Sequence, residues 1–403
     1  MAKTSKAKVI VAGSGPAGLT AALALARNGF AVTLVGPDIR TDDRRTTALM
    51  APSVAFLRLL GVAVRLLENA APLRVMRIVD ATSRLVRSPP VTFRAAEIGE
   101  EFFGLNIPNA HLNRVLEEAV AAHSDIEWQR TTVAEWRLLP ERAVAVLASG
   151  DEIEGLLVAA ADGRASPARA AAGIATRRTA LHQAALVVNF AHTREHEGIS
   201  TEFHTETGPF TQVPLPGVRS SLVWVVRPET ADELAALPDA ELSRRIAERM
   251  QSILGKVTVE PGRQVYPLAS ISPLSFAANR VALVGEAAHV FPPIGAQGLN
   301  LGIRDVEDLA SIAARHAADP GAAAALGEYD RRRRADILAR SSAVNLLNRS
   351  LLSGLLPAQL ARFAGLGALG ALSPLRGFFM REGLRPGSGF AALTGDLREK
   401  VRR

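Results

Sequence analysis

Short apolar runs separated by a glycine-rich turn dominate the start of the chain. Residues 9–12 are apolar and follow Lys8, residues 13–18 read Gly-Ser-Gly-Pro-Ala-Gly, and residues 19–27 place apolar side chains at helical spacing. A glycine at position 29 ends this helix, and residues 31–35 form a second apolar run typical of a buried strand. The pattern therefore predicts a strand–turn–helix–strand unit. This is the local context in which a Gly-x-Gly-x-x-Gly motif binds a dinucleotide.

The glycines of this turn have distinct expected roles. Gly13 permits the tight turn, Gly15 lets the main chain approach a pyrophosphate, and Gly18 lets the helix pack on the strand. The helix would direct free N–H groups and a partial positive charge at the phosphates. Gly36 replaces the acid that usually follows the second strand for the ribose hydroxyls, and Asp38 is the next carboxylate. A glycine-rich turn without a ligand is the alternative interpretation.

A second glycine-rich segment lies at residues 285–305, and residues 279–285 before it are typical of a turn followed by a buried strand. Glu286 lies at the carboxyl end of this predicted strand, where open α/β sheets bind ligands. A helix that begins near residue 299 would direct its amides at the intervening turn, which is typical of a site for a flat, electron-accepting ring. His289 has no evident carboxylate or nucleophile partner, which favours an orienting or structural role over acid–base catalysis.

Apolar segments in the middle of the chain predict further strands. Residues 155–161 form an apolar strand that ends in Asp162 and Gly163. Trp224 lies in a second group of strands and is assigned to packing rather than to catalysis. The strands of this second group are expected at residues 184–190, 208–215 and 220–226.

The region from residue 343 to residue 379 is rich in Leu, Ala and Gly, with arginines at positions 349, 362 and 376. One interpretation is a helix that lies flat on a membrane, with its arginines at the lipid headgroups. A helix pair packed on the rest of the protein and an interface with a partner are the alternatives. No run of 18 or more uncharged apolar residues is present, so a transmembrane helix is not expected.

Composition narrows the function classes. The chain has 403 residues, of which 48% are hydrophobic and 22% charged, so a large packed core is expected. It has no cysteine, which excludes disulfides, thiolate catalysis and Cys-ligated zinc. The net charge is +7, but no basic run alternates with aromatic residues, so nucleic-acid binding is not expected. No metal site is expected either, and the glycines of residues 13–18 break the apolar core that a signal peptide needs.

Three motifs in this order resemble those of the class A flavoprotein aromatic hydroxylases: Gly13–Gly18, Asp162-Gly163, and Gly285-Glu286. Residues 285–305 are most similar to the ubiquinone-biosynthesis hydroxylases (UbiH/UbiF-like). The resemblance implies an α/β fold like that of p-hydroxybenzoate hydroxylase, with a Rossmann-like FAD-binding domain, a β-sheet substrate domain and a helical C-terminal region. The implied boundaries are 1–75, 105–178 and 268–340 for the FAD-binding domain, 76–104 and 179–267 for the sheet domain, and 341–403 for the helical region.

The resemblance also implies individual contacts. Arg45 matches an arginine near the pyrophosphate, Asn109 matches a polar position beside the FAD, and Asp162 and Gly163 match a motif in contact with both FAD and NADPH. Glu286 replaces the usual aspartate at a ribityl hydroxyl. Motif and resemblance together assign these residues to the cofactor: Gly13, Gly15, Pro16, Ala17, Gly18, Asp38, Arg45, Asn109, Asp162, Gly163, Glu286, Pro293, Gly295, Ala296, Gln297, Gly298, Leu299 and Asn300.

The function implied by the resemblance is a flavoprotein monooxygenase. It would use FAD, NADPH or NADH, and O₂ to hydroxylate a polyprenylated phenol in ubiquinone biosynthesis. The alternatives are a soluble hydroxylase of another aromatic compound, and a non-catalytic member of a quinone-biosynthesis complex, which Gly36 and Glu286 favour. The expected location is the cytoplasm, with a peripheral position at the inner face of the membrane or in a protein complex. No catalytic residue is assigned, because in such enzymes the cofactor carries the chemistry.

Overall fold

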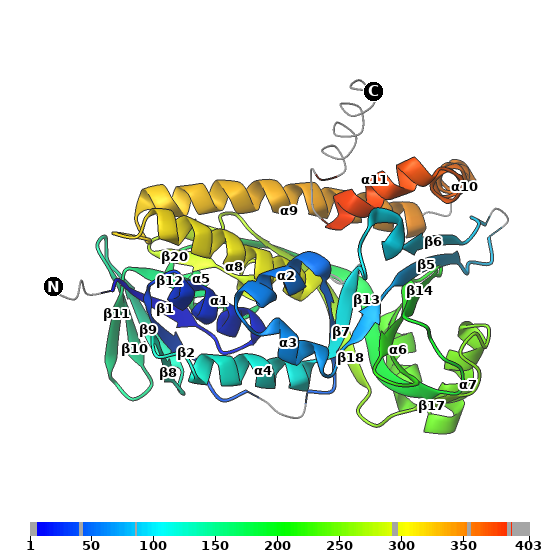
Figure 1. The fold of residues 1–403 in the computed structure, drawn as a ribbon, viewed down its shortest axis with the longest axis horizontal. Coiled ribbons are helices and arrows are strands. Elements are labelled where there is room, and N and C mark those ends of the chain that lie inside the picture. Colours follow the sequence, from blue (N-terminus) through cyan, green and yellow to red (C-terminus); the bar gives the residue numbers. More distant parts are fainter. Residues whose placement is uncertain are drawn as a thin grey trace, which may run out of the picture.

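The computed structural model describes residues 6–39, 43–84, 87–291, 297–352, 356–384 and 388, with only the main chain described at 297, 339–352 and 356–363. Figure 1 shows two large sheets side by side, one flanked by α1, α4 and α8 and the other by α6 and α7, with α9 running along the molecule. This is the mixed α/β architecture that the sequence predicts.

The elements follow in chain order. The described strands are β1 (Lys8–Ala12), β2 (Ala31–Val35), β3 (Thr46–Met50), β4 (Ala71–Leu73), β5 (Val75–Asp80), β6 (Val91–Arg94), β7 (Gly104–Pro108), β8 (Ile126–Gln129), β9 (Val133–Leu138), β10 (Ala143–Leu147), β11 (Glu152–Gly155), β12 (Leu157–Ala160), β13 (Thr176–His192), β14 (Ile199–His204), β15 (Pro209–Leu215), β16 (Arg219–Val226), β17 (Val257–Val259), β18 (Gln264–Pro273), β19 (Ala277–Ala278) and β20 (Val281–Leu283). The described helices are α1 (Pro16–Arg27), α2 (Ala51–Leu59), α3 (Ala63–Leu67), α4 (Asn109–Ala121), α5 (Pro167–Ala171), α6 (Pro228–Ala236), α7 (Asp239–Arg249), α8 (Gln297–Arg315), α9 (Ala323–Leu352), α10 (Leu356–Ala371) and α11 (Ser373–Leu384), with 3₁₀ turns at Ala95–Ile98 and Gly285–Ala287.

The first large sheet has six strands in the order β19-β20-β12-β1-β2-β8. β1 pairs in parallel with both β2 and β12, and β20 continues the parallel run beyond β12. Strands buried on both faces need apolar side chains at every position, which is why their sequences show no alternation. The predicted strands at residues 8–12 and 31–35 are observed with the same bounds. The intervening helix begins at Pro16, three residues before the predicted start, because proline is well suited to the first helical turn.

The second large sheet has eight strands, with the order β17-β13-β16-β15-β14-β5-β6 and with β18 paired to β13. Helices α6 and α7 bury Leu234 and Ile246 against it. Trp224 on β16 is buried in the same core, edge-on to Phe210 with ring centroids 5.0 Å apart. The long strands β13 and β18 pair along both the predicted sheet domain and the segments assigned to the FAD-binding domain. The predicted boundaries at residues 178 and 268 therefore fall within continuous strands and stay a proposal.

The last helices pack on the edge of the second sheet. Met380 on α11 is buried against Ala95 and Phe103, and α10 contacts β6. Arg376 does not point outward as expected for a contact with lipid headgroups. Its side chain is 14% exposed and forms an ion pair with Glu97, with Nε 2.7 Å from Oε2. Residues 349 and 362 lie where no side chains are described.

Candidate functional site

The turn between β1 and α1 uses its glycines for different physical reasons. Gly13 has φ +105°, and a Cβ there would lie 2.3 Å from the carbonyl oxygen of Ala161. A Cβ on Gly18 would lie 1.8 Å from the carbonyl oxygen of Gly13, because α1 starts directly on the turn. A Cβ on Gly15 would meet no protein atom within 4 Å. The turn is thus closed at its first and third glycines and open at the second, where a phosphate would approach.

The start of α1 is free to receive an anion. No side chain caps its N-terminus, and its first turn contains no acidic residue. The first amides of a helix lack intrahelical partners, and the helix dipole favours negative charge beside them. Pro16 removes one of these donors, which leaves the amides that follow, from Ala17 onward. The arrangement fits the diphosphate of a dinucleotide.

The two glycine-rich motifs, nearly 270 residues apart in the chain, meet at this helix. A Cβ on Gly285 would lie 3.1 Å from the Cβ of Ala17, and one on Gly302 would lie 3.6 Å from the same atom. The approach is tight at Gly285, and also at Gly302, where a Cβ would lie 3.1 Å from the Gly285 Cα, so small residues favour the packing of the 3₁₀ turn, the start of α1 and helix α8. The nucleotide turn and the predicted ring-binding segment therefore belong to one site.

The structure at the end of β2 shows why position 36 has no acidic residue. A Cβ on Gly36 would lie 2.6 Å from the Ser14 nitrogen and 2.7 Å from Ser14 Oγ, which donates a hydrogen bond of 2.6 Å to the Pro37 carbonyl. Ser14 thus occupies the space that a side chain at position 36 would need. Asp38, the alternative ribose ligand, has a 72% exposed side chain that is ion-paired with Arg130.

Arg45 and Asn109 come together around a third residue, Asp43, that the sequence did not single out. Arg45 Nε and Nη2 donate to the two Asp43 oxygens at 2.8 and 2.7 Å, and Asn109 Nδ2 donates to Oδ2 at 3.1 Å. Burial raises the pKa of the Asp43 carboxyl, but hydrogen bonds from Arg45 and Asn109 outweigh it and hold that pKa below its usual range. Thr47 completes the cluster by donating to Asn109 Oδ1 at 2.7 Å. Both predicted residues are therefore oriented by the half-buried carboxylate of Asp43.

The Asp162-Gly163 motif shapes its own loop. Asp162 accepts hydrogen bonds from Ser166 Oγ at 2.5 Å and from the Ala168 amide at 3.0 Å, so both carboxylate oxygens are engaged at the start of α5. Burial raises the pKa of the Asp162 carboxyl. Gly163 has φ +85°, a conformation that favours glycine. Arg169 then links this loop to the 3₁₀ turn by donating to the Ala287 carbonyl at 2.8 Å.

Glu286 forms a two-pronged ion pair with Arg164, with Nε and Nη2 each 3.1 Å from one carboxylate oxygen. Its side chain is 55% exposed, so the carboxylate remains within reach of a ligand. Arg45 also lies within electrostatic range, because the Glu286 charge contributes to the raised pKa of the Arg45 guanidinium, after the larger effects of Asp43. Through Arg164, Glu286 therefore joins the Asp162 loop to the 3₁₀ turn at Gly285–Ala287.

The beginning of α8 is held by Asn300. Its Oδ1 accepts the Met50 amide at 2.8 Å and its Nδ2 donates to the Ala48 carbonyl at 2.8 Å, so α8 is fastened to β3 and to the start of α2. Gly298 is exposed and Leu299 packs on the core of the first sheet. The remaining predicted contacts of this segment, Pro293, Gly295 and Ala296, lie outside the described residues, as does the side chain of Gln297.

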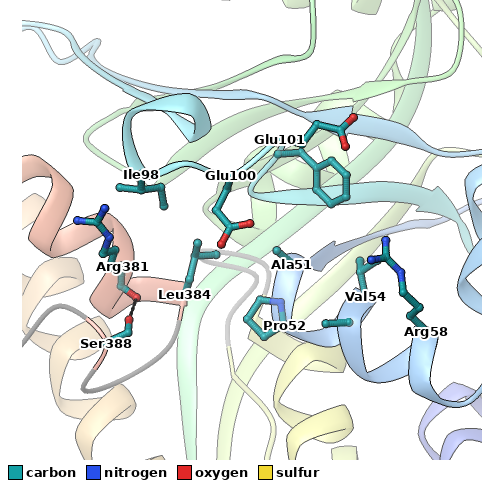
Figure 2. A pocket seen from close by; sticks show the side chains of 12 residues that line it. Ala51, Pro52, Val54, Arg58, Ile98, Glu100, Glu101, Arg381, Leu384 and Ser388 are labelled. Atoms are coloured by element: carbon teal, nitrogen blue, oxygen red, sulfur yellow. Dashed lines mark hydrogen bonds between the residues drawn. The ribbon is translucent and has the colours of Figure 1, made fainter. Parts of the chain in front are cut away.

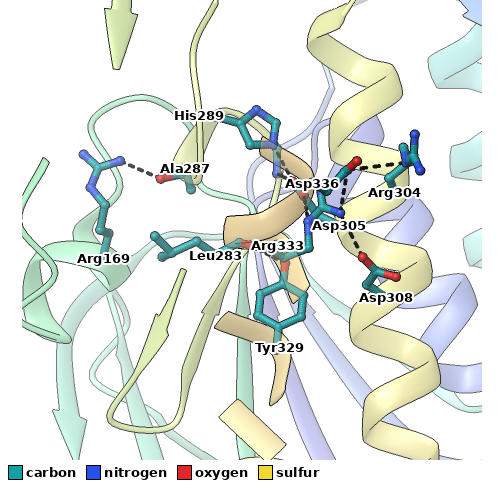
Figure 3. Close-up of polar contacts among 11 residues, drawn as sticks. Arg169, Leu283, Ala287, His289, Arg304, Asp305, Asp308, Tyr329, Arg333 and Asp336 are labelled. Carbon is teal, nitrogen blue, oxygen red and sulfur yellow. Dashed lines mark hydrogen bonds and ion pairs between the residues drawn. The ribbon is translucent and has the colours of Figure 1, made fainter. Parts of the chain in front are cut away.

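A buried charged network lies behind the Gly285 turn and is the largest feature that the sequence did not reveal (Figure 3). Asp305 on α8 is fully buried and accepts hydrogen bonds from the Gly285 amide at 2.9 Å, His289 Nε2 at 2.8 Å and Arg333 Nε at 2.7 Å. Arg333 on α9, 1% exposed, also contacts Asp308 at 2.8 Å through Nη1. His289 thus has the carboxylate partner that the sequence did not show, in a structural setting that orients the turn.

The charges of this network determine its protonation. Burial raises the pKa of Asp305, but the adjacent His289 and Arg333 outweigh burial and hold that pKa below its usual range. Tyr329, beside them on α9, donates to the Leu283 carbonyl at 2.6 Å, and burial raises the pKa of its hydroxyl well above the usual value. The network therefore holds β20, the Gly285 turn, α8 and α9 together. Arg333 carries no sequence signal because it sits in a run of four arginines, residues 331–334.

A cavity of about 480 Å³ lies next to this site, between α2, residues 98–102 and α11. Figure 2 shows Arg58, Glu100 and Glu101 around it, with Ser388 bonded to the Arg381 carbonyl on the opposite wall. Its lining includes none of the residues assigned to the cofactor. Within the described part of the chain, no group of three His, Cys, Asp or Glu could hold a metal ion, and no helix is long and apolar enough to cross a membrane.

Comparison with known proteins gives a uniform result. The family model described as an FAD binding domain matches residues 6–340. Ubiquinone hydroxylase UbiL of Rhodospirillum rubrum is 33% identical over 392 residues, covering 94% of this chain and 89% of that protein. The 3-demethoxyubiquinol 3-hydroxylase of Escherichia coli is 29% identical over 382 residues, covering 89% of this chain and 93% of that protein.

Among solved structures, the p-nitrophenol 4-monooxygenase PnpA of Pseudomonas putida has a TM-score of 0.76 to this chain. Its sequence is 22% identical, and the match covers 95% of this chain and 98% of that one. At this identity the likeness concerns the fold, which is that of the p-hydroxybenzoate hydroxylase-like flavoproteins, as predicted.

Proposed function

Because the chain belongs to the FAD binding domain family and, within it, to the ubiquinone hydroxylases, we propose that its substrate is a polyprenylated phenol of ubiquinone biosynthesis. It is an FAD-dependent monooxygenase that uses NAD(P)H and O₂. The observation that carries the proposal is the 33% identity to UbiL over 94% of the chain. A relationship of that extent includes both large sheets and the segments between them.

The described residues suit the cofactor that the family binds. The ADP part would lie on the open side of Gly15, with its diphosphate against the free amides of α1. Arg45 and Asn109, oriented by Asp43, would complete the phosphate side, and Glu286 would accept a ribityl hydroxyl. The N-terminus of α8 would lie at the ring, where its dipole stabilises negative charge.

FAD supplies the chemistry when bound, by taking electrons from NAD(P)H and activating O₂ for hydroxylation of a phenol ring. The chain contributes position and exclusion of water. Contacts between the second large sheet and the strands β3 and β7 support this role. Thr46 Oγ1 lies 3.0 Å from Ser221 Oγ, and Asn106 Nδ2 donates to the Pro214 carbonyl at 2.8 Å. These bonds hold the second sheet against β3 and β7, beside the proposed ring position. In this proposal the second sheet covers the substrate.

A peripheral position at the membrane is the second part of the proposal. Leu372 lies just before α11 and Phe379 within it, and their exposed fractions are 54% and 51%. Both provide apolar contacts for a bilayer or for a partner of the same pathway. A polyprenyl substrate resides in the bilayer, so an enzyme that docks there shortens the path of the substrate. The double variant Leu372→Ser, Phe379→Ser is expected to lower co-sedimentation with anionic lipid vesicles while leaving flavin content unchanged.

The proposed function is tested by deleting the gene in its host and identifying the quinones by mass spectrometry. Ubiquinone is expected to fall, and a prenylated precursor lacking a ring hydroxyl is expected to accumulate. Reintroducing the gene under ¹⁸O₂ should restore the hydroxyl with the heavy isotope, because monooxygenases take that oxygen from O₂. Unchanged quinones in the deletion strain, or a hydroxyl labelled from water, would show that the proposal is wrong.

A further inference from the structure

The carboxyl ends of β2 and β8 place Trp128 and Arg130, to which no role has yet been given, beside Asp38, the predicted ribose ligand. The two strands are parallel neighbours, with Val35 opposite Gln129. Trp128 Nε1 donates to the Gly36 carbonyl at 2.9 Å, so the indole closes the end of β2 from the side of β8. The neighbouring Gly13 turn is connected to the same strand, because the Gly13 amide donates to the Val35 carbonyl at 2.7 Å.

Arg130 lies on this indole. Its guanidinium carbon is 4.3 Å from the centroid of the Trp128 ring, well within the range of a cation–π contact. Asp38 forms an ion pair with Arg130 from the end of β2, and Glu117 on α4 approaches the same Nη1 at 3.4 Å. Two carboxylates and an aromatic ring therefore hold one guanidinium, whose side chain is still 46% exposed.

The position of this group relative to the nucleotide turn suggests its use. In doubly wound sheets the ligand lies outside the carboxyl ends of the strands, with the ribose beyond the end of the second strand. In this chain that place has no carboxylate at position 36, since Ser14 fills the space of any side chain there. Instead, the planar guanidinium of Arg130 lies on Trp128 beyond the end of β2, with the exposed Asp38 carboxylate beside it.

We propose that Arg130, held on Trp128 and ion-paired with Asp38, binds the adenosine end of the cofactor, and that Asp38 takes over the role of the absent acid. The adenine ring stacks on the exposed guanidinium plane, and the Asp38 carboxylate accepts hydrogen bonds from the ribose hydroxyls. Arginine planes stack on bases, whereas the flexible ammonium of lysine does not. This inference rests on the proposed placement of FAD and adds the residues that recognise its adenosine end.

The test compares two flavins on the apoprotein. FAD and FMN share the isoalloxazine ring and ribityl chain, but FMN lacks the adenosine. Titration followed by flavin fluorescence should show that Arg130→Ala weakens FAD binding about tenfold, the loss expected for one stacked base. FMN binding should stay within about twofold of the wild type. Arg130→Lys should weaken FAD binding nearly as much, because the charge remains but the plane is lost.

Arg137→Ala is the matched control, because Arg137 is also about half exposed, at 47%, and is likewise held by two carboxylates, Glu135 and Glu152. It should bind both flavins like the wild type. Equal weakening of FAD and FMN by Arg130→Ala, no weakening of either, or wild-type FAD binding by Arg130→Lys would overturn the inference. Hydroxylation is not measured, so an error about the phenol substrate leaves these results unaffected.

Discussion

The buried network around Asp305 makes a strong prediction about stability. Arg333→Met keeps an unbranched side chain of similar length but removes the only guanidinium that bonds Asp305 among the described contacts. Asp305 is fully buried, and Asp308 is 8% exposed. In the variant, both carboxylates lose a charge-assisted hydrogen bond of 2.7–2.8 Å with no access to water in exchange.

Removing one partner of a buried ion pair costs about 3–5 kcal/mol, because the remaining charge is left desolvated. The free energy of unfolding of a domain is typically about 5–15 kcal/mol, so Arg333→Met should remove a large share of it. The neighbouring Arg332 gives a matched control. It contacts the same Asp308, with Nε 2.6 Å from Oδ1, but its side chain is 54% exposed. Arg332→Met should therefore lower the free energy of unfolding by about 1 kcal/mol or less.

The pH dependence of the stability shows whether the unpaired charge of Asp305 causes the loss. In the wild type the pKa of Asp305 is lowered, so its contribution to stability is present above the unfolded pKa and is lost as the pH falls. Without Arg333, burial should raise this pKa above the unfolded value of about 3.9, so that the contribution is lost as the pH rises. The gap between variant and wild type should thus widen between about pH 4 and pH 7.

Urea denaturation of the apoprotein, followed by tryptophan fluorescence at several pH values, measures this gap. Arg333→Met and Arg332→Met should differ by about 2 kcal/mol or more at neutral pH and converge in acid. The reasoning is refuted if the two variants unfold at the same urea concentration at neutral pH, or if their difference is independent of pH. Either result would mean that Asp305 does not depend on Arg333 for its charge.

Three further predictions separate binding, folding and packing. Gly15→Val should yield folded protein without flavin absorbance, because its side chain enters the open side of the turn; a yellow protein with normal circular dichroism would contradict the placement of the diphosphate. Gly18→Ala should instead lower the thermal midpoint, since its Cβ would lie 1.8 Å from the Gly13 carbonyl oxygen; an unchanged midpoint would show that α1 does not rest on the turn. Trp224→Phe should keep kcat within about twofold while lowering stability by about 1–2 kcal/mol, because it leaves a void beside Phe210. A large loss of kcat without loss of stability would show that Trp224 is more than a packing residue.

Much of the first sheet could be predicted because its information is local. Residues 8–12 and 31–35 are mostly apolar, and the glycine-rich turn between β1 and α1 is defined by conformations that few other residues adopt. The order of the three motifs was likewise sufficient to identify the family and the fold, both of which are confirmed. The sequence left the packing of residues 343–379 open, because amphipathic helices have the same pattern on a membrane and on a protein surface. In the structure, Arg376 forms an ion pair with Glu97.

By itself, the sequence determined the strands on either side of the phosphate turn, the position of that turn, and, through the resemblance of its motifs, the class of cofactor that the chain binds. The tertiary structure alone decided which charges meet. Asp305 and Arg333 are 28 residues apart, and Asp38 and Arg130 are 92 residues apart. Nothing in the local spacing joins these pairs, since charged residues are normally solvated and only the packing of α8 on α9 and of β2 on β8 brings them together. The tertiary structure also explains why position 36 has no acidic residue, because the fold places Ser14 where its side chain would lie.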